Sequence, residues 1–212
     1  MVPAWLRPLV ERVGDIRGED LTRFLPPEDG GREAAVLVLF GEGPDGPDLL
    51  LIERAADMRS HAGQPAFPGG GVDPSDPDAV AAALREAQEE TGLDPAGVEV
   101  VGTLPRLFLP PSGYVVTPVL GWWREPSAVS AMDPSEVAAA HRVPLTELTE
   151  PANRFRVRHP SGWIGPAFGV RGMVVWGFTA GLLDRLIALA GWERPWDADC
   201  IEELPVTAWQ AP

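Results

Sequence analysis

The chain has 212 residues, of which 45% are hydrophobic, and a formal net charge of −14 at pH 7. A chain of this length and composition can bury one substantial core, so we expect a single domain over residues 1–212, with a core at about 34–189 and extensions at both ends. The negative charge argues against a nucleic-acid or anionic-membrane partner, because those surfaces attract clustered positive charge.

The amino terminus and the cysteine content favour a cytoplasmic protein. Charged residues interrupt the first 15 positions, where a secretory signal would need an apolar core. Cys200 is the only cysteine in the sequence, which excludes a disulfide within the chain. The most hydrophobic segment, residues 173–183, is too short to cross a bilayer, and we interpret it as part of a buried helix.

The predicted elements alternate between strands and helices. A short amphipathic helix at 3–13 precedes a hairpin whose strands end near Phe40 and Arg54. Both strands carry apolar residues at consecutive positions, which indicates a sheet covered on both faces. Further strands are expected at 97–104, 114–123, 136–145 and 155–160, with a helical turn at 146–148 and an apolar helix at 172–191. This alternation is typical of an α/β or α+β sandwich.

Residues 54–93 combine a loop rich in arginine and glycine with a helix that ends in REAQEETGL. On an ideal helix, Glu86, Glu89 and Glu90 fall within a wedge about 100° wide. Like charges this close repel, so stability is a poor reason for the arrangement. A hard divalent cation, Mg²⁺ or Mn²⁺, is a better reason, while an acidic face in contact with solvent stays the alternative.

The segment 71–93, GVDPSDPDAVAAALREAQEETGL, resembles the signature of the Nudix hydrolases, Gx5Ex7REUxEExGU, where U is apolar. One fixed position differs, because Pro77 stands where the signature has its first glutamate. In the family that glutamate supports the loop and its arginine, here Arg85, and Asp76 or Asp78 would have to substitute for it. The resemblance implies a Nudix-type α/β/α sandwich with a mixed sheet, and a Mg²⁺ or Mn²⁺ ion held by glutamates of the helix. The residues carried over as metal ligands are Glu86, Glu89, Glu90 and the carbonyl of Gly70.

A second pattern lies directly upstream and is similar to that of Nudix coenzyme A pyrophosphatases, LLxxR[SA]x3Rx3Gx3FPGG. Its fixed positions match Leu50, Leu51, Arg54, Ala55, Arg59, Gly63, Phe67, Pro68, Gly69 and Gly70. The resemblance covers most of residues 34–189. It implies a small-molecule substrate, coenzyme A or a derivative, split at its diphosphate into 3′,5′-ADP and 4′-phosphopantetheine. A family tendency to dimerise adds a homodimer to these expectations.

The resemblance also suggests roles in catalysis. Glu89 or Glu90 would be the general base, and Glu136 from a later loop is the alternative. Arg85 lies four residues before Glu89 and would hold that carboxylate in position.

Substrate contacts are expected from Arg54, Arg59 and His61, because a guanidinium suits phosphate. For the two arginines, pairing with acids stays an alternative, and for His61 a hydrogen bond within the loop. Small side chains on the helix would leave room for a diphosphate, namely Ala79, Ala82 and Ala83. An apolar groove for pantetheine would be lined by Phe67, Leu107, Phe108 or Trp122.

Two other functions stay open. One is a Nudix hydrolase acting on another nucleoside diphosphate derivative, such as ADP-ribose or a dinucleotide. The other is a ligand sensor with the same fold and no catalysis, against which the three intact glutamates argue. Near the end of the core, Arg154, Arg156 and Arg158 alternate along an expected strand. We interpret them as a face in contact with solvent, and a stripe that faces phosphate stays the alternative.

Overall fold

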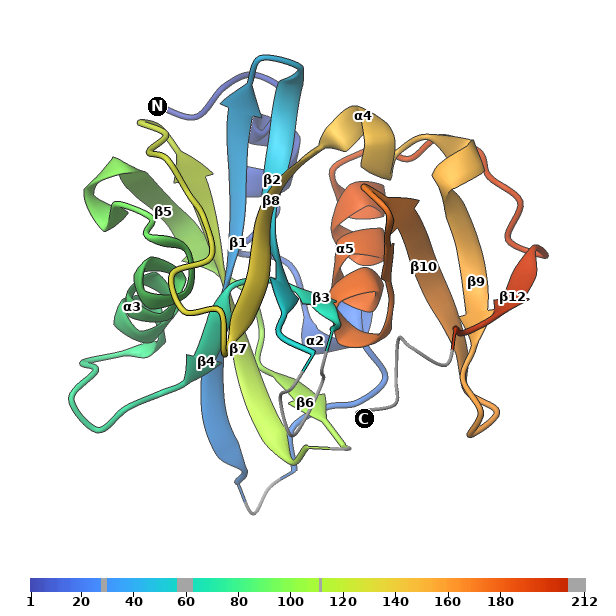
Figure 1. Ribbon diagram of the computed structural model, residues 1–212, viewed down its shortest axis with the longest axis horizontal. Helices are drawn as coiled ribbons and strands as arrows, with labels where there is room; N and C mark the ends of the chain where they lie inside the picture. Colours follow the sequence, from blue (N-terminus) through green and yellow to red (C-terminus); the bar gives the residue numbers. More distant parts are fainter. Residues whose placement is uncertain (28–29, 57–62, 111, 206–212) are drawn as a thin grey trace.

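Two β-sheets enclose one helix in the structure (Figure 1). The structure is a computed structural model and describes residues 1–27, 30–56, 63–110 and 112–205. The first sheet is mixed and has the strand order β3-β2-β1-β7-β5, with β4 also pairing β1, β6 pairing β7 and β8 pairing β2. Its strands are β1 (Arg32–Gly43), β2 (Gly46–Arg54), β3 (Pro65–Ala66), β4 (Gly69–Gly71), β5 (Val98–Thr103), β6 (Leu107–Leu109), β7 (Tyr114–Trp123) and β8 (Val137–Pro144).

The second sheet is smaller and has the order β11-β10-β9-β12. Its strands are β9 (Arg154–Arg158), β10 (Ile164–Val170), β11 (Met173–Val175) and β12 (Ile201–Glu203). The helices are α1 (Arg7–Val10), α2 (Gly18–Leu21), α3 (Ala79–Thr91), α4 (Leu145–Leu148) and α5 (Gly177–Leu189), with short 3-10 turns at Pro95–Gly97 and Pro151–Asn153.

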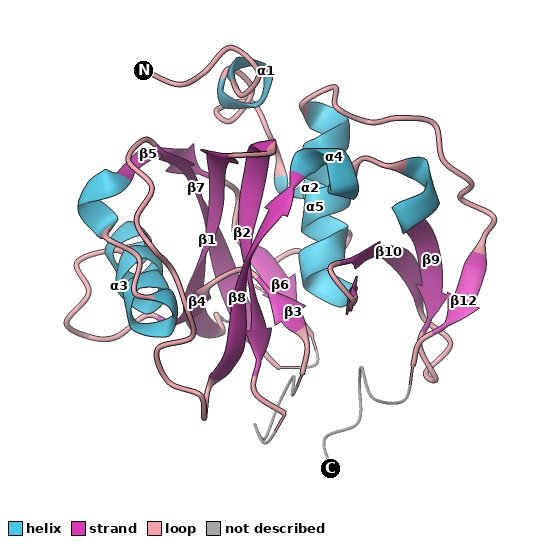
Figure 2. Ribbon diagram, turned by 45° about the horizontal axis from the view of Figure 1, so that its top comes forward, coloured by secondary structure: helices cyan, strands magenta, loops and turns pink. Residues whose placement is uncertain are grey.

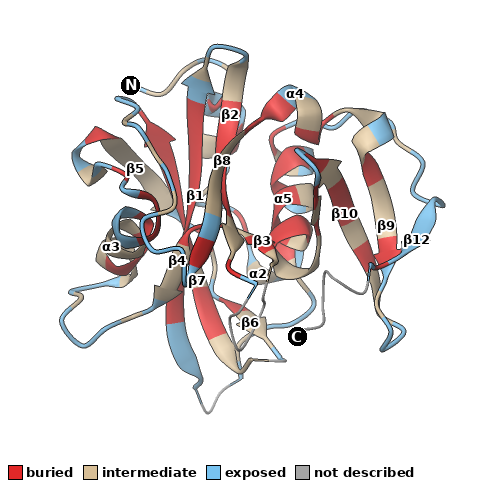
Figure 3. Ribbon diagram, viewed as in Figure 1, coloured by how far each residue is buried: buried red, intermediate tan, exposed pale blue. Residues whose placement is uncertain are grey.

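Helices cover both faces of the first sheet. Figure 2 shows α3 on one face and α5 on the other, and the second sheet covers the far side of α5. The predicted α/β/α sandwich with a mixed sheet is therefore confirmed, whereas the second sheet was not predicted. Buried residues concentrate where the first sheet, α5 and β10 face one another (Figure 3).

The hairpin of β1 and β2 explains the consecutive apolar residues. In β1, Leu37 and Leu39 pack in the core on the α3 side, whereas Val38 and Phe40 pack in the core on the α5 side. Because neighbouring residues of a strand point to opposite faces, a strand covered on both faces needs apolar residues at every position. The prediction that both faces are covered is confirmed.

Capping residues close both ends of helix α3. The carboxylate of Asp78 accepts a hydrogen bond from the N–H of Ala81 at 2.9 Å, and Gly92 closes the helix with φ 72°. Ala82 and Ala83 are fully buried against the first sheet. The expectation that these alanines leave room for a diphosphate is therefore wrong, because their small size serves close packing of the helix on the sheet.

The segment 172–191 is only partly helical. Its first apolar residues form β11, which pairs with β10 through Met173 opposite Val170. Two consecutive valines, Val174 and Val175, suit a strand, and Gly177 starts the helix with φ 65°. The helix expected from residue 172 therefore begins five residues later. The amphipathic helix expected at 3–13 is likewise shorter, since α1 spans four residues between turns.

Arg154, Arg156 and Arg158 of β9 were interpreted as a face in contact with solvent, and for Arg154 this interpretation is wrong. The Arg154 side chain is 1% exposed and forms ion pairs with Asp184 of α5 and with Glu193. Strand alternation alone does not reveal this, because α5 covers that face of the second sheet.

Within the described residues, no helix is long and apolar enough to cross a membrane.

Candidate active site

Strand β4 brings a run of three glycines beneath helix α3. Gly70 lies opposite Ala35 of β1 in an antiparallel pair. A Cβ at Gly70 would lie 2.5 Å from Cδ of Glu86, so the Glu86 carboxylate rests directly on the glycine backbone. Only glycine permits this approach.

The most buried acid of the group is Glu90, whose side chain is 5% exposed. Its Oε2 accepts a hydrogen bond from the N–H of Gly69 at 2.9 Å, and its Oε1 lies 3.8 Å from Nη1 of Arg54. Burial raises the pKa of Glu90 to about 7, although Gly69 and Arg54 both act to lower it. Among the described residues, Nε of Arg54 is buried without a hydrogen-bond partner.

Arg85 connects the carboxylate of Glu89 to the loop before α3. Its Nη1 donates to Oε1 of Glu86 at 3.0 Å and to Oε2 of Glu89 at 2.9 Å. The other side of the guanidinium donates to Asp76 and to the carbonyl of Gly71. The predicted proximity of Arg85 and Glu89 is confirmed, and the side chain of Glu89 is 60% exposed.

The loop before β8 brings Glu136 to the same region. Its carbonyl accepts a hydrogen bond from the N–H of Ala55 at 2.9 Å, directly after Arg54. Burial is the main cause that raises the pKa of Glu86, Arg85 opposes this, and the charges of Glu89 and Glu136 raise it further. The charge of Glu136 also raises the pKa of Glu90. Four glutamates from two segments therefore act on one another electrostatically.

The donor set suits a hard cation, although the side chains are not gathered around one. Across the described residues, no three His, Cys, Asp or Glu side chains lie close enough together to hold a metal ion as they stand. The reason is visible in their contacts, because Glu89 pairs with Arg85 and Glu90 turns to Gly69. The donors are all oxygens, and the absence of a side chain at Gly70 lets the Glu86 carboxylate lie against the backbone of β4. These features fit a Mg²⁺ or Mn²⁺ ion.

The expected substrate residues have different locations. Arg54 lies beside Glu90 at the end of β2, whereas Arg59 and His61 lie outside the described residues. Phe67 is 2% exposed and packs in the core on the α5 side, so its side chain is not on a binding surface. Three other residues were expected to line a pantetheine groove. Leu107 and Trp122 are buried, like Phe67, whereas Phe108 is half-buried.

Sequence reasoning missed one contact of the site and left another open. The N–H of Gly69 as a donor to Glu90 has no sequence signal, because any residue carries that group. The carboxylate that holds Arg85 was open between Asp76 and Asp78, and in the structure it is Asp76. Asp78 caps α3 instead.

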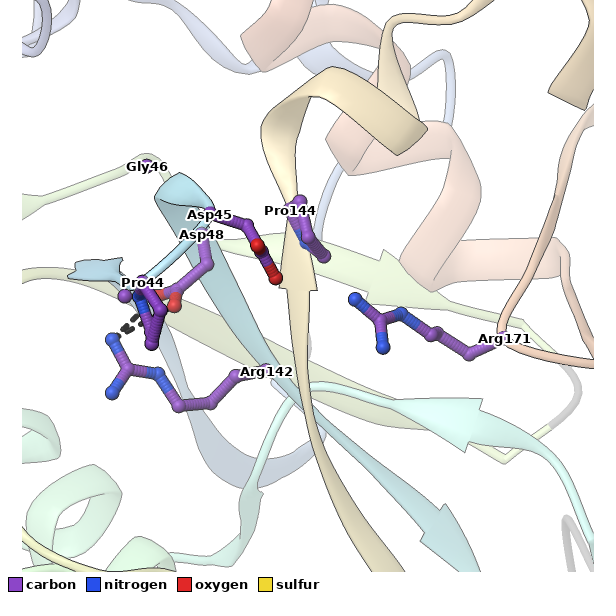
Figure 4. A pocket seen from close by; sticks show the side chains of 8 residues that line it. Pro44, Asp45, Gly46, Asp48, Arg142, Pro144 and Arg171 are labelled. Atoms are coloured by element: carbon purple, nitrogen blue, oxygen red, sulfur yellow. Dashed lines mark hydrogen bonds and ion pairs between the residues drawn. The ribbon is translucent and has the colours of Figure 1, made fainter.

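A small cavity of about 180 Å³ lies elsewhere, at the turn between β1 and β2 (Figure 4). Two arginines line it, and both already have acidic partners. Arg142 pairs with Asp48 at 2.7 Å, and Arg171 pairs with Glu147 at 2.8 Å. The positive charges of both arginines are thus balanced by acids of the same chain. The cavity lies at the opposite end of β2 from Arg54.

Comparisons with known proteins agree with the geometry. The family model described as "NUDIX domain" matches residues 31–163. A protein of Cronobacter sakazakii named "Uncharacterized Nudix hydrolase NudL" is 42% identical over 171 residues, covering 77% of this chain and 85% of that protein. A protein of the same name from Escherichia coli K12 is 40% identical over 170 residues, covering 76% and 83%.

Solved structures show the same fold. A Nudix hydrolase from M. smegmatis, RenU, has a TM-score of 0.54 and 20% identity, covering 82% of this chain and 98% of that one. A Nudix hydrolase from Nitrosomonas europaea has a TM-score of 0.51 and 15% identity, covering 82% and 80%.

Proposed function

We propose that this chain, which belongs to the Nudix hydrolase family, cleaves the diphosphate of coenzyme A or its derivatives to 3′,5′-ADP and 4′-phosphopantetheine. The family match and the relatives make the chain a Nudix diphosphatase. The names of those relatives specify no substrate, so the choice of coenzyme A is our own. We further propose that residues 1–212 act as a single domain and that the enzyme works in the cytoplasm as a homodimer.

One observation carries the proposal, which is that the two sequence patterns meet at one place. The upstream pattern supplies Arg54 from the end of β2 and Gly69 from β4, and both contact Glu90 of the Nudix signature. Gly70 of the same pattern lies against Glu86. Arg54 therefore lies beside an acid of α3, at the place where the Nudix signature puts its glutamates. These contacts support a common site, in which the glutamates of the signature and the carbonyl of Gly70 bind the cation and Arg54 contacts the substrate.

The cation is proposed to be Mg²⁺ or Mn²⁺, as the resemblance to the Nudix hydrolases implies and as a donor set made only of oxygens favours. Its ligands would come from Glu86, Glu89, Glu90 and the carbonyl of Gly70. When bound, such an ion neutralises the diphosphate and lowers the pKa of a coordinated water.

The side chains of the chain itself would divide the remaining work. Glu90 is our first choice for the group that accepts the proton of the attacking water, with Glu89 and Glu136 as alternatives. Arg85 would keep Glu86 and Glu89 oriented, because it donates a hydrogen bond to each. Arg54, whose side chain is 21% exposed, would bind a phosphate oxygen through its guanidinium.

Outside the diphosphate, recognition is proposed to depend on the segment between β2 and β3. Arg59 and His61 would contact the 3′-phosphate of the adenosine moiety, which distinguishes coenzyme A from ADP-ribose. Phe67 is not among the proposed substrate contacts, because its side chain is in the core.

The test is analysis of products after incubation with coenzyme A and Mn²⁺. We expect 3′,5′-ADP and 4′-phosphopantetheine in equal amounts, and no turnover in excess EDTA. Efficient cleavage of ADP-ribose or a dinucleotide with coenzyme A left intact would refute the substrate assignment and favour the first alternative. Binding of these compounds without hydrolysis of any would favour a ligand sensor.

A further inference from the structure

We infer that Asp76 is a positioning residue that replaces, one position earlier, the glutamate that this chain lacks at position 77. The inference rests on the proposed function, since it concerns how the same site holds its glutamates. Asp76 would act through Arg85, without touching the substrate or the cation.

The contact between Asp76 and Arg85 is bidentate. Nε of Arg85 donates to Oδ1 of Asp76 at 3.0 Å, and Nη2 donates to Oδ2 at 2.9 Å. Two parallel hydrogen bonds between a guanidinium and a carboxylate fix orientation as well as distance. The Asp76 side chain is 5% exposed, so water has little access to compete for the carboxylate.

The remaining donors of Arg85 reach the candidate site. A guanidinium has five N–H groups, and Asp76 takes two of them. Nη1 donates to Glu86 and Glu89, and Nη2 also donates to the carbonyl of Gly71 at 3.2 Å. Every N–H of the guanidinium therefore has an acceptor, and the orientation of the group follows from where Asp76 holds it.

A tight turn presents Asp76 to the arginine. The N–H of Asp76 donates to the carbonyl of Asp73 at 2.9 Å, and the N–H of Asp73 donates to Oδ2 of Asp76 at 2.8 Å. The Asp73 carboxylate closes the turn by accepting from the N–H and the hydroxyl of Ser75. Hydrogen bonds from Arg85 and from the N–H of Asp73 also lower the pKa of Asp76.

The neighbours of Asp76 cannot do the same work. Pro77 has no polar side chain, and Asp78 is occupied as the cap of α3. The carboxylate that holds Arg85 is therefore at position 76, in the turn before the helix, and not at position 77, where the signature has its glutamate. A loss of Asp76 would free one side of the guanidinium and so loosen its hold on Glu86 and Glu89.

The experiment compares three variants with the wild-type chain. Asp76→Ala removes the carboxylate, and the double variant Asp76→Ala/Pro77→Glu returns one at the position that the signature uses. Asp78→Ala is the matched control, because it removes a carboxylate from the helix cap two residues away and leaves the Arg85 contacts in place. The readouts are kcat and KM for coenzyme A with Mn²⁺, Mn²⁺ affinity by electron paramagnetic resonance, and unfolding temperature in EDTA.

We expect Asp76→Ala to lower kcat or Mn²⁺ affinity by about 10- to 100-fold, the range typical when the partner of a metal-ligating group is removed. The double variant should recover most of that loss. Asp78→Ala should lower the unfolding temperature while kcat stays near the wild-type value. Asp76→Asn, which keeps the shape of the side chain, replaces Asp76→Ala if the latter does not fold.

Two results would overturn the inference. One is an Asp76→Ala protein with wild-type kcat and Mn²⁺ affinity. The other is a loss that the double variant does not repair and that Asp78→Ala reproduces at an equal drop in unfolding temperature, since that result indicates a structural role alone. If wild-type protein leaves coenzyme A intact, the proposed substrate fails, and the Mn²⁺ affinities still decide the role of Asp76.

Discussion

The N–H of Gly69 donates a hydrogen bond to Glu90 at 2.9 Å, joining two residues that are 21 positions apart in the chain. This bond ties β4 to the last turn of α3. It also anchors a carboxylate whose pKa is raised to about 7, mainly because it is buried. Burial of a carboxylate opposes folding when the group is ionised, so Glu90 is better explained by function than by stability.

Glu90→Gln should separate these two roles. We expect kcat to fall by about 10²- to 10⁴-fold, the usual contribution of general acid–base catalysis. The glutamine oxygen can still accept from Gly69, so the fold should persist. Above pH 7 the unfolding free energy in EDTA should equal or exceed the wild-type value, because the charged form of Glu90 is the disfavoured one there. Steady-state kinetics and denaturant unfolding measure the two effects.

The comparison variant is Glu89→Gln, whose side chain is 60% exposed in the wild-type chain. A smaller loss of kcat for Glu89→Gln than for Glu90→Gln would support Glu90 as the base. An unchanged rate for Glu90→Gln would show that Glu90 is neither a metal ligand nor the catalytic base.

Gly70→Ala tests the contact between β4 and Glu86. The added Cβ would lie 2.6 Å from both Glu86 carboxylate oxygens, which must then move. We expect a loss of activity of about 10-fold or more, with near-normal thermal unfolding because the carboxylate can shift toward solvent. Gly71→Ala is the spatial control, since the nearest atom to its added Cβ would be the carbonyl oxygen of Glu33, at 4.0 Å. Equal activities of the two variants would contradict the model of a carboxylate confined by Gly70.

Much of the fold follows from local sequence. The β1 and β2 hairpin was predicted from two short runs of apolar residues, and α3 from the helical spacing of its residues, which places Glu86, Glu89 and Glu90 on one side. By contrast, β4 consists of Gly69–Gly71, and glycine has no preference for strands. Its pairing with β1 depends on long-range contacts that a local pattern does not contain.

The site shows the same division. The three glutamates were placed on one side of α3 by helix periodicity, yet their burial differs from 5% for Glu90 to 60% for Glu89. Periodicity gives the direction of a side chain, whereas burial depends on what packs there, here β4 and the end of β2. For the same reason Ala82 was assigned to the substrate side when it faces the sheet.

Arg154 is expected to stabilise the second sheet strongly. Its buried guanidinium pairs with Asp184 and Glu193 and lies 5.4 Å from the ring of Phe168 and 4.5 Å from that of Trp196. Arg154→Ala should lower the unfolding free energy by about 3 kcal/mol, because it leaves acids of the pair without a partner. Denaturant unfolding measures this change.

Arg158→Ala is the control on the same strand. Its partner Glu203 is 78% exposed, so the ion pair should contribute less than about 1 kcal/mol. Similar losses for the two variants would show that the burial of Arg154 does not strengthen its ion pairs.

The last prediction concerns the acid dependence of the Asp76 contact. Hydrogen bonds, chiefly from Arg85, lower the pKa of Asp76 below the value of about 3.8 for an unperturbed aspartate. A carboxyl whose pKa is lower in the folded state contributes stability above its unfolded pKa, and that contribution is lost as the pH falls through the folded pKa. In EDTA, wild-type protein should therefore be more stable than Asp76→Asn at pH 6, and the difference should shrink as the pH falls below about 4. The comparison isolates Asp76 because the other acids titrate in both proteins. A stability difference that stayed constant down to about pH 2 would contradict an ionic contact between Asp76 and Arg85.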